Sequence, residues 1–287
     1  MTPATQRASL LLEAFKMEAK QDLRALCRQL GLRVREVDST GFEGALVRSR
    51  EAQKGIIAVK RAVRETSRKR FTIAHEIGHF VIPHHRLLAN VCESQTVERF
   101  DKGLDRPELE ANEFAAELLL PNRVVRSRFN FREPSLADIR AVAREFETSL
   151  TATTYRYLDL TDLRCAMVWS EAPRVVWYHR SDAFPFYVPL PDLPARQSVA
   201  GRLFAGEAVT EGLHQVSPEL WLDVRDAERV RLLLEDALFL PYYNAVLSLL
   251  WIAEMETGRA ESDQDELLPE LDPEEFTLGR KHWPTRR

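Results

Sequence analysis

The sequence feature that most restricts the fold is the run from His75 to His79, which reads His-Glu-Ile-Gly-His. Residues four apart lie on one face of an α-helix, so a helix here would direct both imidazoles toward one cation. Glu76 is offset by one position and would lie beside a metal-bound water without binding the metal. Zinc lowers the pKa of such a water toward about 7, where a carboxylate can accept its proton. The motif therefore predicts a metal site with ligands His75 and His79 and with Glu76 as general base.

The residues around the motif favour a buried helix over 66–82, ending before Pro83. They are apolar or small and include Phe71, Ala74, Ile77 and Val81. Gly78 would let another backbone approach closely, at some cost in helix propensity. The alternative, two histidines that are simply hydrogen-bonded in a core, is disfavoured by this context.

A catalytic zinc site that keeps one position open needs a third protein ligand. One candidate is His85, which follows His75 by ten residues, as in the extended H-E-x-x-H-x-x-G-x-x-H pattern. That pattern has a glycine at the position of Ile82, and a β-branched residue resists the positive φ of a sharp turn. His85 is therefore the less favoured candidate.

The favoured third ligand is Glu108, at the start of a helix expected over 107–120. The inward face of this helix carries Glu108 and Asn112 among Ala111, Ala115, Leu118 and Leu119. An unpaired carboxylate on such a face is costly, and a metal would explain it. Asn112, one turn on, is expected to orient a ligating histidine. The alternative for Glu108 is stabilisation of the helix dipole. The opposite face, with Glu110, Glu113 and Glu117, is interpreted as a solvated stripe.

Two segments together, 70–79 and 108–121, resemble the ImmA/IrrE family of metallopeptidases. The resemblance is specific over residues 55–122, looser up to residue 160, and faint beyond. It implies a zinc-peptidase core followed by a helix-turn-helix-like segment, with one Zn²⁺ held by His75, His79 and Glu108. It also implies cleavage of a helix-turn-helix transcriptional repressor, which relieves repression in a stress response. The 83–107 loop and the region after 160 depart from the family.

The expected fold class is α+β. Four parts are expected along the chain. They are a mostly helical zinc-peptidase core with a small N-terminal sheet (1–125), a helix-turn-helix-like segment (126–162), a second α+β domain (163–260) and a flexible tail (261–287). The remaining expected elements are a helix over 7–30 capped by Gly31, strands over 32–37, 45–48, 55–60, 166–170 and 174–179, and helices over 135–146, 149–159, 195–205, 226–237 and 242–257. The apolar stretch 237–253 is shorter than the roughly 18 to 20 residues of a spanning helix and predicts a buried core helix.

Composition restricts the class of protein and its partners. The chain has 287 residues, is 45% hydrophobic and 29% charged, and carries a net charge of −4. These values are typical of a globular protein and make a nucleic acid an unexpected main partner. Cys27, Cys92 and Cys165 are too far apart for a thiolate zinc site and suit a reducing compartment. Without a secretory signal near residue 1, we expect a cytoplasmic protein; the oligomeric state is not predicted.

Three functional interpretations follow. The leading one is a zinc endopeptidase acting on a repressor, with the 45–60 strand pair aligning substrate backbone and with His84, His85 or Tyr155 as candidates to stabilise the oxyanion. The rival is a non-catalytic regulator with a structural metal, in which the 135–159 helices bind DNA. In the third, the C-terminal domain is a sensor whose aromatic residues line a pocket, although such residues are more often core: Trp169, Trp177, Tyr178, Phe184, Phe186 and Tyr187.

Overall fold

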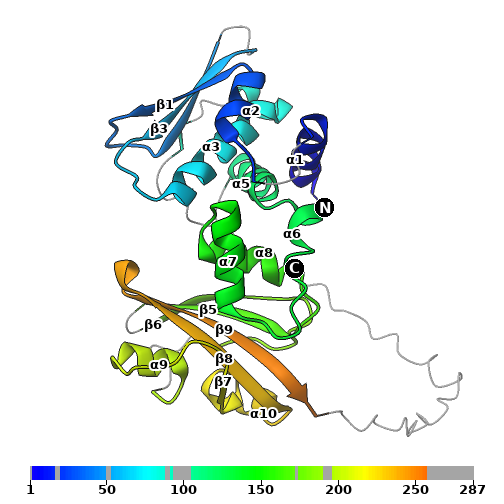
Figure 1. The fold of residues 1–287 in the computed structure, drawn as a ribbon, viewed down its shortest axis with the longest axis vertical. Helices are drawn as coiled ribbons and strands as arrows, with labels where there is room; N and C mark the ends of the chain where they lie inside the picture. Colours follow the sequence, from blue (N-terminus) through cyan, green and yellow to red (C-terminus); the bar gives the residue numbers. More distant parts are fainter. Residues whose placement is uncertain are drawn as a thin grey trace, which may run out of the picture.

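The computed structural model describes residues 2–16, 20–49, 53–87, 91–92, 105–171, 174–189 and 196–256. An N-terminal sheet with its helices lies at the top of Figure 1, a C-terminal sheet lies at the bottom, and α7 and α8 lie between them. This arrangement confirms the α+β class. The expected tail 261–287 and most of the expected 83–107 loop lie outside the described residues.

The N-terminal sheet has the strand order β1-β3-β2-β4. Its strands are β1 (Leu32–Val37), β2 (Gly44–Arg48), β3 (Gly55–Lys60) and β4 (Val91–Cys92). β1 runs parallel to β3, and β2 is antiparallel to β3, so the three expected strands are confirmed. β4 pairs with β2 only at Gly44 and Ala45. It therefore covers part of the edge that β2 was expected to offer to a substrate.

The single helix expected over 7–30 is wrong, because two helices occupy this region. They are α1 (Pro3–Ala14) and α2 (Leu23–Gln29). Lys16 takes a left-handed φ of 51° after α1, and the Asp22 side chain caps the N-terminus of α2. The apolar spacing continues across this break, which is why periodicity alone joined the two helices. Gly31, with φ of 76°, follows α2 as expected of a C-terminal cap.

Helices α3 (Thr66–Val81) and α5 (Arg106–Leu119) confirm the two helices expected to carry the site. They pack closely at Gly78, where an added Cβ would lie 3.3 Å from Ala111 Cα and 3.1 Å from Phe114 Cδ1. The glycine thus permits the close helix crossing that brings the two halves of the motif together. A 3₁₀ turn, η1 (Pro83–Leu87), follows α3, and α6 (Asn122–Val125) follows α5.

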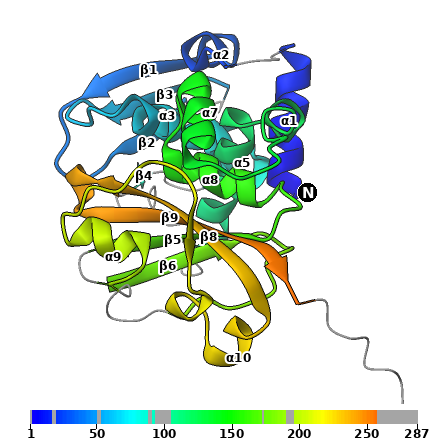
Figure 2. The same ribbon diagram turned by 60° about the horizontal axis from the view of Figure 1, so that its bottom comes forward.

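The C-terminal sheet is antiparallel, with the strand order β6-β5-β9-β8-β7. Its strands are β5 (Cys165–Glu171), β6 (Arg174–Arg180), β7 (His214–Val216), β8 (Val230–Leu240) and β9 (Ala245–Met255). One face packs against α7 and α8, and the other against a cluster that includes α9 (Val199–Phe204), as Figure 2 shows. The remaining short elements are η2 (Pro218–Leu220), α10 (Val224–Ala227) and η3 (Pro241–Tyr243).

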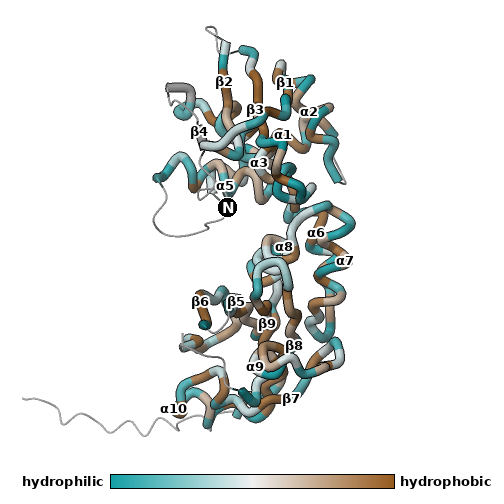
Figure 3. The backbone as a smooth tube through the Cα atoms, turned by 90° about the vertical axis from the view of Figure 1, so that its left-hand side faces the viewer, coloured by the Kyte–Doolittle hydropathy of each residue, from teal (hydrophilic) through white to brown (hydrophobic). Residues whose placement is uncertain are grey.

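The helices expected over 226–237 and 242–257 are wrong, because these segments are mainly the long strands β8 and β9. β9 lies inside the sheet with both faces covered, so its apolar residues do not alternate with polar ones (Figure 3). Such a run resembles a buried helix in periodicity. Pro241 and Asn244, which has φ of 47°, form the turn between the strands. In the described part of the chain, no helix is long and apolar enough to cross a bilayer.

The helix pair α7 (Leu136–Phe146) and α8 (Leu150–Leu158) is confirmed, with Ser135 and Ser149 as N-caps. Both helices share one hydrophobic core with β5 and β9, and this core crosses the boundary expected at residue 162. Much of α8 is buried, including Thr153, Arg156 and Tyr157.

Candidate metal centre

Three side chains from α3 and α5 converge on one point. His75 Nε2 lies 3.0 Å from His79 Nε2, and the two Glu108 oxygens lie 3.2 Å and 3.3 Å from these nitrogens. Ligand atoms about 2.1 Å from a tetrahedral zinc would be about 3.4 Å apart, so the spacing fits one ion. Both histidines are buried, whereas the Glu108 side chain is 23% exposed. The structure therefore brings the three expected ligands together, with Glu108 toward solvent.

Asn112 lies where the sequence places the partner of a ligating histidine. Its Oδ1 is 2.8 Å from His75 Nδ1. An amide oxygen only accepts hydrogen bonds, so Nδ1 of His75 carries the hydrogen. The lone pair of the ring is then on Nε2, which faces Glu108. This hydrogen bond holds His75 in the tautomer that a metal requires.

The electrostatics of the centre favour a cation. Burial raises the pKa of Glu108, but its contacts with the buried imidazoles of His75 and His79 outweigh this effect and hold the pKa of Glu108 well below its usual range. Burial lowers the pKa of His79 below its ordinary value. Burial also lowers the pKa of His75, but its contact with Glu108 and the charge of Glu76 outweigh this effect, so the net shift is upward. The centre thus combines an anionic carboxylate with two buried imidazoles, and this set of groups favours binding of a cation.

Glu76 is fully buried between α3 and the start of β2. Its negative charge acts on His75, as expected for a residue beside the metal-facing ring. A Cβ built on Gly44 would lie 2.6 Å from Glu76 Oε1 and 2.5 Å from Thr72 Cγ2. Only a glycine lets this strand pass so close to the carboxylate. Gly44 is not among the site residues expected from the sequence, because nothing in a single sequence pairs it with Glu76.

We expect Gly44→Ala to lower stability, because an added methyl must displace Glu76 or Thr72. Overpacking of this kind costs about 1–3 kcal/mol in the free energy of unfolding, which urea denaturation measures. Gly41→Ala is the matched control, since a Cβ there meets nothing within 4 Å. Equal stability for the two variants would contradict the tight contact at Gly44.

His85 is not placed as a third ligand of this centre, so that candidate is wrong. Its Nδ1 lies 3.0 Å from Nδ1 of His79, the nitrogen on the far side of the ring from Glu108. Ile82 has φ of −77°, so the sharp glycine turn of the extended motif is not formed. His85 Nε2 in turn lies 3.1 Å from Glu110 Oε2. His85 therefore contacts a ligand from behind.

The candidates for oxyanion stabilisation are placed elsewhere. His84 is 62% exposed and pairs with Glu110, on the same far side of His79 as His85. Tyr155 stacks on Trp177 with ring centroids 5.6 Å apart, in the aromatic cluster of the C-terminal sheet. The geometry gives none of the three a position that supports that role.

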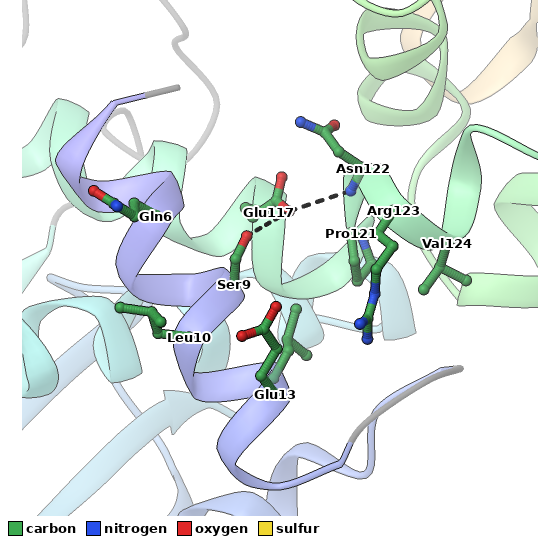
Figure 4. A pocket seen from close by; sticks show the side chains of 10 residues that line it. Gln6, Ser9, Leu10, Glu13, Glu117, Pro121, Asn122, Arg123 and Val124 are labelled. Carbon is green, nitrogen blue, oxygen red and sulfur yellow. Dashed lines mark hydrogen bonds between the residues drawn. The ribbon is translucent and has the colours of Figure 1, made fainter.

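The glutamate stripe of α5 is not solvated as expected. Glu117 is only 2% exposed, Glu113 accepts a hydrogen bond from Thr2 of the N-terminal segment, and Glu110 bonds to two histidines. Helix α1 and the turn after α3 cover this face, which the periodicity of α5 alone cannot show. Figure 4 shows Ser9 and Asn122 reaching Glu117 beside a cavity of about 340 Å³ between α1 and α6.

The aromatic residues of the C-terminal part mostly lie in or against its core. Phe184 and Phe186 are buried, and the rings of Trp169 and Trp177 stack with centroids 5.8 Å apart. Tyr187 is 70% exposed. These positions favour the core interpretation over an aromatic-lined pocket.

Comparison with known proteins identifies the part of the chain that holds the centre. Residues 27–158 match the profile of a peptidase family described as the IrrE N-terminal-like domain. This part of the chain is an IrrE N-terminal-like domain. A Mycobacterium tuberculosis transcriptional regulator shares the fold, with a TM-score of 0.51 and 16% identity over 88% of each chain. A search of the curated proteins found no match.

The IrrE N-terminal-like domain contains all five site residues expected from the sequence: His75, Glu76, His79, Glu108 and Asn112. The family resemblance is thereby confirmed, and with it a relationship to metal-dependent peptidases. The domain also includes α7 and α8, so its matched length extends into the core shared with the C-terminal sheet.

Proposed function

We propose that this chain is a cytoplasmic zinc-dependent endopeptidase that cleaves a helix-turn-helix transcriptional repressor and so relieves repression in a stress response. The observation that carries the proposal is the convergence of His75, His79 and Glu108 from two helices. Glu76, buried beside His75, is the second support. A purely structural metal would have no use for a carboxylate in this position.

Each residue has a definite task in this reaction. A zinc ion held by the three ligands would supply an acidic water and polarise the scissile carbonyl. Glu76 would accept a proton from the attacking water and pass it to the leaving amine. Burial between α3 and β2 excludes bulk water from its carboxylate. The edge of β2 beyond β4, at Leu46–Arg48, can align an extended substrate backbone by strand addition.

The repressor as substrate rests on the family resemblance and on the burial of α8. With Thr153, Arg156 and Tyr157 buried, much of α8 packs against the rest of the protein, which makes it a poor candidate for direct DNA reading. The net charge of −4 also disfavours a duplex as the main partner. We therefore infer that this domain affects transcription by acting on another protein rather than by reading DNA directly.

The proposal is tested by incubating the full chain, with and without Zn²⁺, with candidate helix-turn-helix repressors of the same organism. Intact mass spectrometry should show two fragments whose masses sum to the repressor plus one water. Glu108→Gln, which removes an anionic ligand, should lose zinc and cleavage together. Zinc binding without cleavage, combined with salt-dependent binding to duplex DNA, would favour the non-catalytic regulator instead.

A further inference from the structure

A chain of hydrogen-bonded groups extends behind His79, away from the metal-facing side. His79 Nδ1 lies 3.0 Å from His85 Nδ1, and His85 Nε2 lies 3.1 Å from Glu110 Oε2. His79 and His85 are buried, and the Glu110 side chain is 16% exposed. The three groups therefore form a short line from a partly solvated carboxylate to a metal ligand.

The positions of the hydrogens along this chain of groups follow from the Glu110 carboxylate at its outer end. A carboxylate only accepts hydrogen bonds, so Nε2 of His85 carries the hydrogen that faces Glu110. A neutral His85 then has its lone pair on Nδ1, which accepts from Nδ1 of His79. His79 in turn has its own lone pair on Nε2, the nitrogen that faces Glu108. Each step is fixed by the one before it.

We propose that Glu110 is a positioning residue that acts through His85 to hold His79 in its metal-binding tautomer. The inference rests on the metal centre of the proposed function. It gives the two histidine ligands matching support, because Asn112 fixes His75 through one hydrogen bond and Glu110 fixes His79 through two. Helix α5 thus supplies Glu108 to the ion and orients both imidazoles.

Glu110 is itself held in place by its neighbours. Arg106, one turn earlier on α5, donates from Nε to Glu110 Oε1 at 3.0 Å. His84 contacts the other oxygen, Oε2, which also faces His85. These contacts fix the direction of the carboxylate, so it can set the orientation of the His85 ring.

A second cation held by His84, His85 and Glu110 is the competing explanation, since their ligand atoms lie within 4.8 Å of one another. A cation on Nε2 of His85 would leave the hydrogen of that ring on Nδ1. His85 would then donate to His79, and His79 would carry its hydrogen on Nε2, where the first metal must bind. His85 can therefore relay the hydrogen bond from Glu110 to His79 or bind a second metal, but it cannot do both. We call the first of these arrangements the relay.

The test is a zinc titration of the full chain against a competing chelator. Loss of a partner that orients a ligand weakens metal binding about 10–100-fold, so this is the expected effect of Glu110→Ala. Glu110→Gln should recover most of the affinity, because its amide oxygen can accept from His85 as that of Asn112 accepts from His75. Glu113→Ala is the matched control, because Glu113 lies on the same helix but accepts from Thr2 rather than from a histidine, and it should bind zinc as the parent chain does.

Nitrogen-15 NMR of the histidine rings reports the tautomer of each imidazole, which a general loss of stability would not change in this specific way. The zinc-free parent should show His79 with its hydrogen on Nδ1, and Glu110→Ala should show a mixture of tautomers. Failure of the parent chain to bind zinc would overturn both the proposed function and the relay. Zinc binding that is equal in the parent and in Glu110→Ala would overturn the relay alone, as would a second bound zinc that disappears in His84→Ala.

Discussion

Glu76→Gln is expected to retain zinc and to lose peptide hydrolysis. Glutamine has the size and shape of glutamate but cannot accept a proton from water at neutral pH. General-base catalysis contributes about 10²–10⁴-fold to rate, and the cleavage rate should fall by at least this factor. Intact mass spectrometry of the repressor over time measures the rate, and elemental analysis of the dialysed protein measures bound zinc.

The expected retention of zinc follows from the position of Glu76. It lies beside His75 without contributing one of the three converging ligand atoms. Glu113→Gln, at a half-buried position of α5 that bonds to Thr2, controls for the loss of one negative charge. Cleavage at the parent rate would show that Glu76 is not the base, and loss of the metal would show that Glu76 instead holds the ligands in place.

Most of the candidate metal centre could be predicted because it depends on the geometry of single helices. The i, i+4 spacing of His75 and His79 and the inward face of α5 are both periodic features of a local segment. Gly78 supplied the remaining link, because a glycine at a helix crossing indicates a close neighbour. Three residues on two helices could thus be assigned to one point without any knowledge of the rest of the fold.

The remaining features depend on contacts between segments that are distant in the sequence. Glu110 and Glu117 have the spacing of a solvated stripe, and only the packing of other elements against α5 makes them hydrogen-bonding partners. β9 looked like a helix because both sheet faces are covered, which removes the alternation that marks a strand. The Pro241–Asn244 turn was the one local signal that could have separated β8 from β9.

The IrrE N-terminal-like domain and the C-terminal sheet are joined by more than a shared apolar core. Asp236 of β8 accepts a hydrogen bond of 2.8 Å from the backbone N–H of Leu136, at the start of α7. Arg156 of α8 faces the other way, toward α5 and α6. The helix pair is therefore fixed on two sides, and a change at Arg156 tests the side that contacts α5 and α6.

Arg156→Met is expected to destabilise the protein strongly. Arg156 Nη1 lies 3.4 Å from Glu117 Oε2 and donates to Asn122 Oδ1 at 2.8 Å. Both charged side chains are nearly fully buried. Removing one partner of such a pair leaves an uncompensated buried charge and costs about 3–5 kcal/mol in the free energy of unfolding. Urea denaturation of the zinc-free chain at pH 7 measures this loss.

A matched control and a double variant separate the buried charge from other effects. Arg128→Met removes an exposed partner of Glu145, a pair that typically contributes less than about 1 kcal/mol. Arg156→Met combined with Glu117→Gln should recover part of the loss, because no buried charge then remains and the amide oxygen can still accept from Ser9 and Asn122. A double variant less stable than Arg156→Met alone would show that the Glu117 charge is not the cause.

The loss in Arg156→Met should also depend on pH in a defined direction. Burial raises the pKa of Glu117 above its ordinary value even with Arg156 present, so in the folded state this carboxyl releases its proton at a higher pH than in the unfolded chain. Ionisation of Glu117 therefore lowers stability as the pH rises through the folded pKa. Without Arg156 that pKa rises further, and the difference in unfolding free energy between variant and parent should be small in acid and grow toward neutral pH. A difference that stays constant across this range would mean that lost packing of the arginine stem, rather than the stranded carboxylate, destabilises the variant.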